Sequence, residues 1–303
     1  MSPFAFRPRP EHRPRATGNP QGLRLRWLGT AGHVLEGAGV TLLFDPFLTR
    51  SGLLTTALRR LRPTPERWRQ HLPPRVDAIL VGHSHYDHLL DAPTIARETG
   101  ALLVGSRSAL QFARAEGVPE AQLREVPPQG ATFSVGAATV RFVPSLHGLI
   151  VAGRVPFPGT VDAPPSVPAR VWHYRMGGAF GIHVTLEGRS VYHNGSANLV
   201  DAELQGLSAD VVLLGLAGRR GTREYVRRVL GALRPSLVVP SHHDSFFSPL
   251  EDGVRLLPGI DLRGFERDLG ALDAPPALRT PTYEDVLVVP SQGSPAEAVV
   301  LYR

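Results

Sequence analysis

The feature that most constrains this chain is a histidine-rich stretch that directly follows a short apolar run. Three histidines and one aspartate, namely His83, His85, Asp87 and His88, fall within six residues. The apolar run before them, residues 76–81, contains β-branched residues and predicts a short buried strand. A cluster of this kind at a strand end predicts a metal site rather than a solvated turn.

The spacing within this stretch suits metal binding. Two imidazoles separated by one residue, as in His83 and His85, project the same way from an extended segment and can hold one ion. Asp87 and His88 lie beyond the turn and can face a second, adjacent ion. Imidazole and carboxylate ligands favour Zn²⁺, with Mn²⁺ or Fe²⁺ as alternatives, so we expect one or two zinc ions as the cofactor.

More ligands must come from distant parts of the chain. His147, His193 and the neighbours His242 and His243 each end or follow a predicted strand. Ligands usually bind at such strand ends in layered sheet folds. We expect His147 and His242 to be ligands, whereas a structural role is favoured for His193 and His243.

The order of the predicted elements indicates two packed sheets with helices outside. Strands come first, then strand–helix alternation, then strands and alternation again, including a strand at 211–216 and an amphipathic helix at 222–233. This order predicts an α+β fold, a four-layer αβ/βα sandwich. We expect a flexible arginine- and proline-rich arm at residues 1–22 and a single domain over residues 23–303.

The composition excludes several classes of chemistry. The chain has no cysteine, which rules out disulfides, thiolate-bound zinc, iron–sulfur clusters and thiol catalysis. All 33 basic residues are arginine, and the net charge of +6 is modest and scattered, which argues against nucleic acid as a partner. No apolar stretch approaches the roughly 20 residues of a membrane helix, and no secretory signal is evident, so we expect a cytoplasmic protein without a transmembrane segment.

Several motifs resemble the metallo-β-lactamase superfamily in their order along the chain. They lie at residues 27–32, 43–46, 83–88 and 240–242, and the similarity covers about residues 24–250. More narrowly, the chain is similar to the branch of metal-dependent hydrolases that includes ascorbate-6-phosphate lactonase and the N-acylphosphatidylethanolamine phospholipase D enzymes. The motifs are specific for the fold and only weakly specific for the substrate.

This resemblance implies that two metal ions are held by six side chains. They are His83, His85 and His147 for the first ion, and Asp87, His88 and His242 for the second. A metal lowers the pKa of bound water and supplies hydroxide near neutral pH. Asp87 would be catalytic, because it would orient that water or accept its proton.

We therefore expect a metal-dependent hydrolase that uses a metal-bound hydroxide on an ester, lactone or phosphodiester. The alternatives are a nuclease-type phosphodiesterase and a degenerate scaffold that binds metal without catalysis. The irregular segment 148–171, rich in glycine and proline, is the candidate substrate loop. Its apolar residues, together with Arg154 and Arg170, suit a small-molecule or lipid-like anionic substrate.

One turn departs from the pattern of the family. Members usually carry a glycine followed by an aspartate that bridges the two ions, but here Gly195 is followed by Ser196. A neutral hydroxyl is a poor bridging ligand, so we expect the second ion to be held more weakly than the first. Asn194, His193 and Asp201 are the residues that could compensate.

Overall fold

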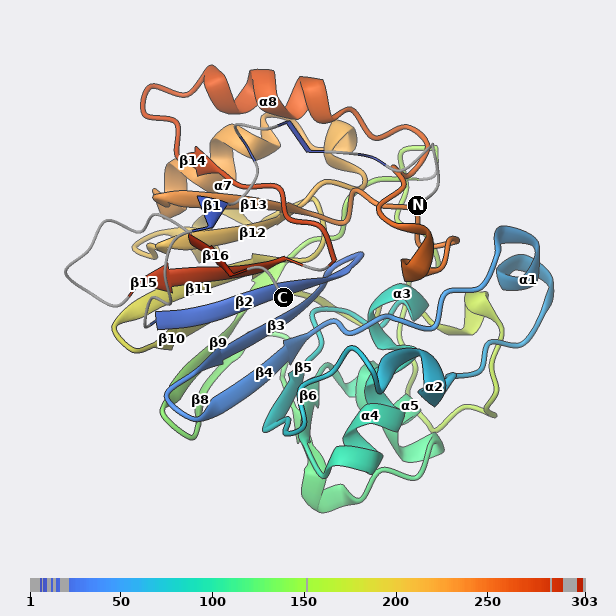
Figure 1. Cartoon of the computed structure of the whole chain (residues 1–303). Coiled ribbons are helices and arrows are strands. Elements are labelled where there is room, and N and C mark those ends of the chain that lie inside the picture. Colours follow the sequence, from blue (N-terminus) through green and yellow to red (C-terminus); the bar gives the residue numbers. More distant parts are fainter. Residues whose placement is uncertain are drawn as a thin grey trace.

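The computed structural model describes residues 6, 8–9, 12, 15–16, 22–150, 152–283, 285–290 and 299–301. Within these residues the strands form two mixed sheets, which lie side by side in Figure 1. In spatial order, the first sheet contains β1 (Arg15–Ala16), β16 (Val299–Leu301), β15 (Val286–Pro290), β2 (Gly22–Gly29), β3 (Gly32–Gly37), β4 (Val40–Phe44), β5 (Ala78–Leu80), β6 (Leu102–Gly105) and β7 (Leu123–Glu125). The second sheet contains β14 (Ala277–Leu278), β13 (Leu237–Ser241), β12 (Val211–Gly215), β11 (Arg189–Asn194), β10 (Ala179–Leu186), β9 (Ala138–Ser145) and β8 (Ala131–Val135).

The helices cover the outer faces of the two sheets. The α-helices are α1 (Leu53–Leu58), α2 (Pro65–Trp68), α3 (Tyr86–Leu89), α4 (Ala92–Thr99), α5 (Arg107–Ala115), α6 (Asp201–Leu204), α7 (Tyr225–Leu233) and α8 (Leu262–Gly270). Short 3₁₀ helices are η2 (Glu120–Gln122), η3 (Val171–His173), η4 (Arg219–Gly221) and η5 (Leu250–Asp252). In Figure 1, α4 and α5 lie beyond the first sheet, whereas α7 and α8 lie on the opposite side of the molecule, beyond the second.

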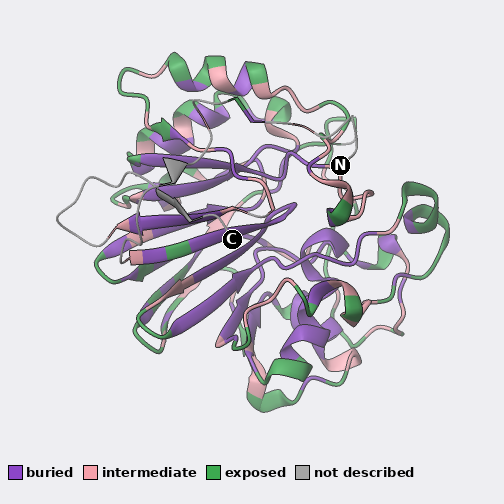
Figure 2. Ribbon diagram, viewed as in Figure 1, coloured by how far each residue is buried: buried purple, intermediate pink, exposed green. Residues whose placement is uncertain are grey.

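Three buried apolar clusters correspond to the three interfaces of this arrangement. One cluster joins the inner faces of the two sheets and includes Leu25 and Phe44 from the first sheet and Ile182 from the second. A second packs the first sheet against α3, α4 and α5, and a third packs the second sheet against α6, α7 and α8. Figure 2 shows the same division, with buried strands at the centre and exposed helix faces outside. Three apolar interfaces separate four layers, which confirms the predicted αβ/βα sandwich.

Strand directions bring distant parts of the chain to one edge of the two sheets. β4, β5 and β6 are parallel to one another, and so are β11, β12 and β13. β9 points the same way as β11, because each pairs antiparallel with β10 between them. In layered sheet folds, ligand sites form at the carboxyl ends of such strands. The segments that follow β4, β5, β9, β11 and β13 carry the residues described in the next subsection.

Local differences from the sequence-based expectations concern single residues and a few elements. In β2, Leu23, Leu25 and Trp27 alternate with two arginines, a pattern that predicts a half-exposed strand. Arg24 is exposed as this pattern predicts, but Arg26 is buried. The strand β3 and the helix α8 were not predicted. β3 contains Gly32, His33 and Glu36 among few apolar residues, so its pattern is too weak to identify it from sequence.

The described residues near the amino terminus contact the domain. The amide of Phe6 donates a hydrogen bond to the Val254 carbonyl, and Arg9 lies 3.1 Å from Glu266. β1 pairs in parallel with β16. Most of residues 1–22 lie outside the described residues, so the boundary between an arm and the domain stays a prediction. Among the described residues, no helix combines the length and apolar character needed to cross a membrane.

Candidate metal centre

Six side chains from three segments, those that follow β5, β9 and β13, meet at the shared edge of the sheets in two groups. The first, called here the histidine group, consists of His83, His85 and His147. The second, called the aspartate group, consists of Asp87, His88 and His242. In each group one nitrogen or oxygen atom per residue lies within 4.8 Å of the others, and all six residues are buried. The sequence-based prediction therefore named the side chains that the fold brings together; their role as ligands is taken up as a proposal below.

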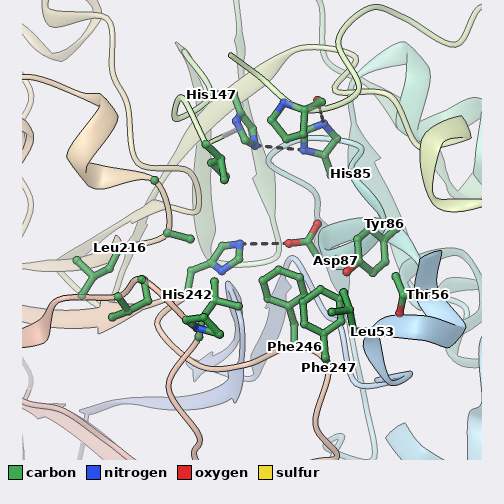
Figure 3. A pocket seen from close by; sticks show the side chains of 18 of the residues that line it. Leu53, Thr56, His85, Tyr86, Asp87, His147, Leu216, His242, Phe246 and Phe247 are labelled. Atoms are coloured by element: carbon green, nitrogen blue, oxygen red, sulfur yellow. Dashed lines mark hydrogen bonds and ion pairs between the residues drawn. The ribbon is translucent and has the colours of Figure 1, made fainter. Parts of the chain in front are cut away.

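Hydrogen bonds to backbone carbonyl groups determine which ring nitrogens of the histidine group face the other members of the group. Nε2 of His85 lies 2.9 Å from the Pro156 carbonyl, and Nδ1 of His147 lies 2.7 Å from the Gly148 carbonyl. A carbonyl oxygen only accepts, so these two nitrogens carry the ring hydrogens when the rings are neutral. The remaining nitrogens, Nδ1 of His85 and Nε2 of His147, then face each other as bare lone pairs 3.1 Å apart (Figure 3).

Protonation does not relieve this contact near neutral pH. Burial lowers the pKa of His85 to about 4 and that of His147 to about 3. Burial also holds the pKa of His83 well below its usual range, and its Nε2 has no hydrogen-bond partner in the described part of the chain. Three unprotonated imidazole nitrogens thus converge on one point, which is the arrangement that a cation of the zinc type requires.

The aspartate group is paired differently. Oδ2 of Asp87 lies 3.2 Å from Nε2 of His242 and 3.8 Å from Nε2 of His88. Burial opposes ionisation of Asp87, but the neighbouring His88 and His242 outweigh it and lower the pKa of the carboxyl group. Burial likewise opposes the charged form of His88, yet Asp45 and Asp87 raise its pKa above the usual value. Two imidazole rings and one carboxylate form a donor set that suits Zn²⁺, Mn²⁺ or Fe²⁺.

Asp45 supports the aspartate group from behind. It is fully buried at the end of β4, and its Oδ2 lies 2.9 Å from Nδ1 of His88 and 2.8 Å from Nε2 of His193. Its Oδ1 accepts a hydrogen bond from the Gly82 amide, just before the histidine-rich stretch. With Nδ1 of His88 held in this way, Nε2 is directed toward Asp87 and His242. This role of Asp45 in positioning His88 was not predicted, although Asp45 lies in the motif at residues 43–46.

Two residues of the site adopt backbone conformations that non-glycine residues rarely occupy. The φ angle is 39° at Asp45 and 53° at His242. The amide of His242 donates to the Thr30 carbonyl, which fixes the turn after β13. Such strain persists where the surrounding structure holds it, and here it aims both side chains toward the shared edge.

The turn after β11 brings Gly195 close to Asp45 and His193. A Cβ atom on Gly195 would lie 2.6 Å from Oδ2 of Asp45 and 2.8 Å from Nε2 of His193, so only glycine fits there. The hydroxyl of Ser196 accepts a hydrogen bond from the amide of Gly148, beside His147. A side chain at position 196 therefore points to the segment that carries the histidine group.

The residues considered as substitutes for a bridging carboxylate have other partners. Asn194 donates to the Tyr225 hydroxyl, His193 pairs with Asp45, and Asp201 pairs with Arg228 on the surface. His243 is fully buried and stacks on Trp27 with ring centroids 4.6 Å apart, outside both groups. Among the described residues, Asp87 is thus the one carboxylate in the two groups.

A cavity of about 510 Å³ opens next to both groups. His85, Asp87, His147 and His242 line its inner end, and Tyr86 stands beside them (Figure 3). Most of the remaining wall is apolar and comes from α1, the 148–171 segment, the end of β12 and the 242–261 segment. The apolar wall residues include Leu53, Ile150, Phe157, Leu216, Phe246, Phe247, Leu257 and Ile260.

Comparison with known proteins gives a consistent result. The family model described as the β-lactamase superfamily domain matches residues 41–257. The chain is 30% identical over 241 residues to a UPF0173 metal-dependent hydrolase from Methanopyrus kandleri, covering 76% of this chain and 87% of that protein. It is 32% identical over 230 residues to a UPF0173 metal-dependent hydrolase from Pyrobaculum arsenaticum, covering 74% of this chain and 85% of the relative.

A solved structure shares the fold. Igni18, a metallo hydrolase from the archaeon Ignicoccus hospitalis, superposes with a TM-score of 0.57 at 20% sequence identity. The match covers 93% of this chain and 100% of that one. At this identity the likeness concerns the fold alone.

Proposed function

Because this chain belongs to the metallo-β-lactamase superfamily and is a metal-dependent hydrolase, we propose that it cleaves an ester or lactone bond in a small substrate with a large apolar group. The proposed metal is zinc, held by the histidine group and the aspartate group. The observation that carries the metal assignment is the facing pair of imidazole lone pairs, Nδ1 of His85 and Nε2 of His147. Only a cation between them makes that contact favourable.

The chain's own residues have defined tasks in this proposal. A bound ion supplies a Lewis acid and lowers the pKa of a water molecule at the site. Asp87 lines the cavity and is held ionised, so it can orient that water and accept a proton from it. His242 fixes the orientation of the Asp87 carboxylate through the 3.2 Å contact. The apolar wall excludes bulk water from the reacting bond.

The charges around the cavity favour a neutral bond over a phosphodiester. Arg219 and Arg220 are the arginines of the wall, and both are paired. Arg219 lies 2.5 Å from Asp268, and Arg220 lies 3.1 Å from Asp261. A phosphodiester carries a permanent negative charge, which a bound metal ion could partly neutralise but which no unpaired arginine of the wall would help to hold. An acyl bond requires no such arginine, and the apolar wall accommodates its hydrocarbon part.

The test is a series of p-nitrophenyl esters of increasing acyl length, with a γ-lactone and bis(p-nitrophenyl) phosphate, assayed on the zinc-loaded protein. We expect kcat/KM to rise with acyl length, by at most about fourfold for each added methylene group. Asp87→Asn should lower kcat while the histidine group keeps its ion. Preference for the phosphodiester, or turnover independent of acyl length, would overturn the proposal.

A variant that fills the cavity sharpens this test. Ala217 lines the wall and is buried, so Ala217→Phe should shorten the longest acyl chain that is cleaved well. The acetyl ester should be cleaved at nearly the original rate. A matched control is Ala113→Phe in α5, which is buried outside the cavity and reports the general cost of overpacking.

A further inference from the structure

Exposed apolar side chains gather in α1, in η3 and at Phe157, and two of them also line the cavity. In α1, Leu53 is 59% exposed, Leu54 is 75% exposed and Leu58 is 65% exposed. Trp172 in η3 is 44% exposed and Phe157 is 37% exposed. Large apolar side chains gathered in this way on a surface mark an interaction site, whereas single exposed leucines do not. We call these five residues the apolar rim.

Specific contacts join the two parts of the apolar rim. The guanidinium of Arg170 donates to the Leu58 carbonyl and lies over the Trp172 ring, 5.1 Å from its centroid. The backbone of Leu61 pairs with that of Ala169 just beyond α1. Leu53 and Phe157 also line the cavity, so the rim is continuous with the cavity wall. In Figure 1, α1 lies in a loop that projects from the body of the molecule.

The chain segments around α1 and Phe157 contain arginines and no carboxylates. Arg59, Arg60 and Arg62 follow α1 directly and are exposed. Neither residues 46–65 nor residues 146–161 contain an aspartate or glutamate. The next carboxylates along the chain, at positions 66 and 162, lie just outside these segments.

From this combination we infer that the apolar rim docks on a lipid bilayer that contains anionic phospholipids. Leucines and a tryptophan enter the interface between head groups and acyl chains, while neighbouring arginines contact lipid phosphates. A second copy of the chain fits less well. In a two-fold contact the rim would meet itself, and the same arginines would face one another as like charges.

Docking of this kind would turn the outer end of the cavity toward the membrane. An apolar substrate could then pass from the lipid phase to the site without crossing water. Binding to the bilayer requires only the apolar rim and the arginines, so it can be tested independently of the proposed hydrolysis.

The test is binding of the full-length protein to vesicles of phosphatidylcholine alone or of equal parts phosphatidylcholine and phosphatidylglycerol. Of the three tryptophans, Trp27 and Trp68 are buried and Trp172 is exposed, so Trp172 is a built-in reporter. We expect co-sedimentation with the anionic vesicles, a blue shift of tryptophan emission, and weakening by salt. No binding to anionic vesicles, or equal binding to both kinds, would overturn the proposal.

Two sets of variants separate the apolar and the charged contributions. Leu54→Ser with Leu58→Ser, neither of which lines the cavity, should weaken vesicle binding by about tenfold or more. Arg59→Gln, Arg60→Gln and Arg62→Gln together should weaken it by on the order of a hundredfold at low salt. The charge-matched control is Arg107→Gln, Arg141→Gln and Arg263→Gln, which removes exposed arginines elsewhere and should have little effect.

Hydrolysis of a soluble short-chain ester keeps the two proposals distinguishable. The leucine variants should cleave it like the unaltered protein, whether or not vesicles bind. One contrary outcome is that the control variant at Arg107, Arg141 and Arg263 loses as much vesicle binding as the variant at Arg59, Arg60 and Arg62. In that case any exposed arginine attracts the anionic vesicles equally, and the apolar rim is not the docking site. If instead the leucine variants convert a dimer to a monomer and vesicles do not bind, the rim is an interface between copies and the proposal is wrong.

Discussion

The histidine group and the aspartate group lie side by side, yet the protein pairs their polar atoms in opposite ways. In the histidine group, carbonyl oxygens take the ring hydrogens of His85 and His147, and lone pairs are left facing each other. In the aspartate group, Asp87 and Asp45 already supply negative charge to His88 and His242. A cation entering the first group completes the contacts of the rings, whereas a cation entering the second competes with existing ion pairs. We therefore expect the histidine group to bind metal more tightly, even though it contains no carboxylate.

The largest effect is expected from removing the histidine group itself. His83→Ala with His85→Ala should abolish the tightly bound ion and reduce hydrolysis to background, because the ligands that converge there are gone. Elemental analysis of the purified variant is the measurement. His183→Ala changes a half-buried histidine on β10 and serves as the control. Undiminished metal in the double variant would contradict the assignment of this group.

Removing the support behind the aspartate group should have a more selective effect. Asp45→Asn tolerates the positive φ angle but loses the charge that holds His88 and His193, so metal affinity of the aspartate group should fall about 10–100-fold. The histidine group should be unaffected, as measured by calorimetric titration of the metal-free protein. Asp77→Asn, in a half-buried aspartate that accepts the Thr41 amide, controls for general destabilisation. An equal loss of metal affinity at both groups would show that Asp45 does not support the aspartate group selectively.

A carboxylate added next to the two groups should reduce the difference between their metal affinities. Mild chelation should leave one ion per chain in the unaltered protein, and Ser196→Asp should raise the affinity of the weaker site by about tenfold. Ser134→Asp on the exposed face of β8 adds the same charge elsewhere and should change nothing. Two equally tight ions in the unaltered protein would show that another residue compensates, and the register at Ser196 would then be wrong.

The smallest effect is expected at the histidine next to the aspartate group. His243→Phe keeps a ring against Trp27 and removes two buried nitrogens that have no hydrogen-bond partner among the described residues. The free energy of unfolding should change by less than about 1.5 kcal/mol, and metal content should not change. His242→Phe should instead empty the aspartate group. Loss of metal in the His243 variant would reverse the roles of these neighbours.

Much of the site could be predicted from sequence because its residues share a local signature. His83, His85, Asp87 and His88 are close in the chain, and His147 and His242 each follow a strand that ends at the same edge. Strand-end position made His147 and His242 candidates together with His193 and His243, and the resemblance to the superfamily completed the set of six. The order of elements was sufficient for the four layers.

The contacts that orient these residues could not be predicted in the same way. Asp45 meets His88 and His193 only after β4, β5 and β11 are placed, and no spacing rule connects those positions. The exposed leucines of α1 also look like an ordinary apolar helix face in the sequence. Their exposure depends on where the loop projects, which is decided by tertiary packing.

The pairing of β2 with β15 has a consequence for how the protein is made. It joins residues 22–26 to residues 286–290, so this pairing in the first sheet forms only after residue 290 has left the ribosome. Until then the inner face of β2, including Leu23 and Leu25, lacks the neighbour that it has in the native sheet. Such sequence-distant pairing slows folding and leaves an unpaired strand edge open to aggregation during synthesis. Chaperones that shield nascent chains are therefore expected to affect the yield of this protein more than its final stability.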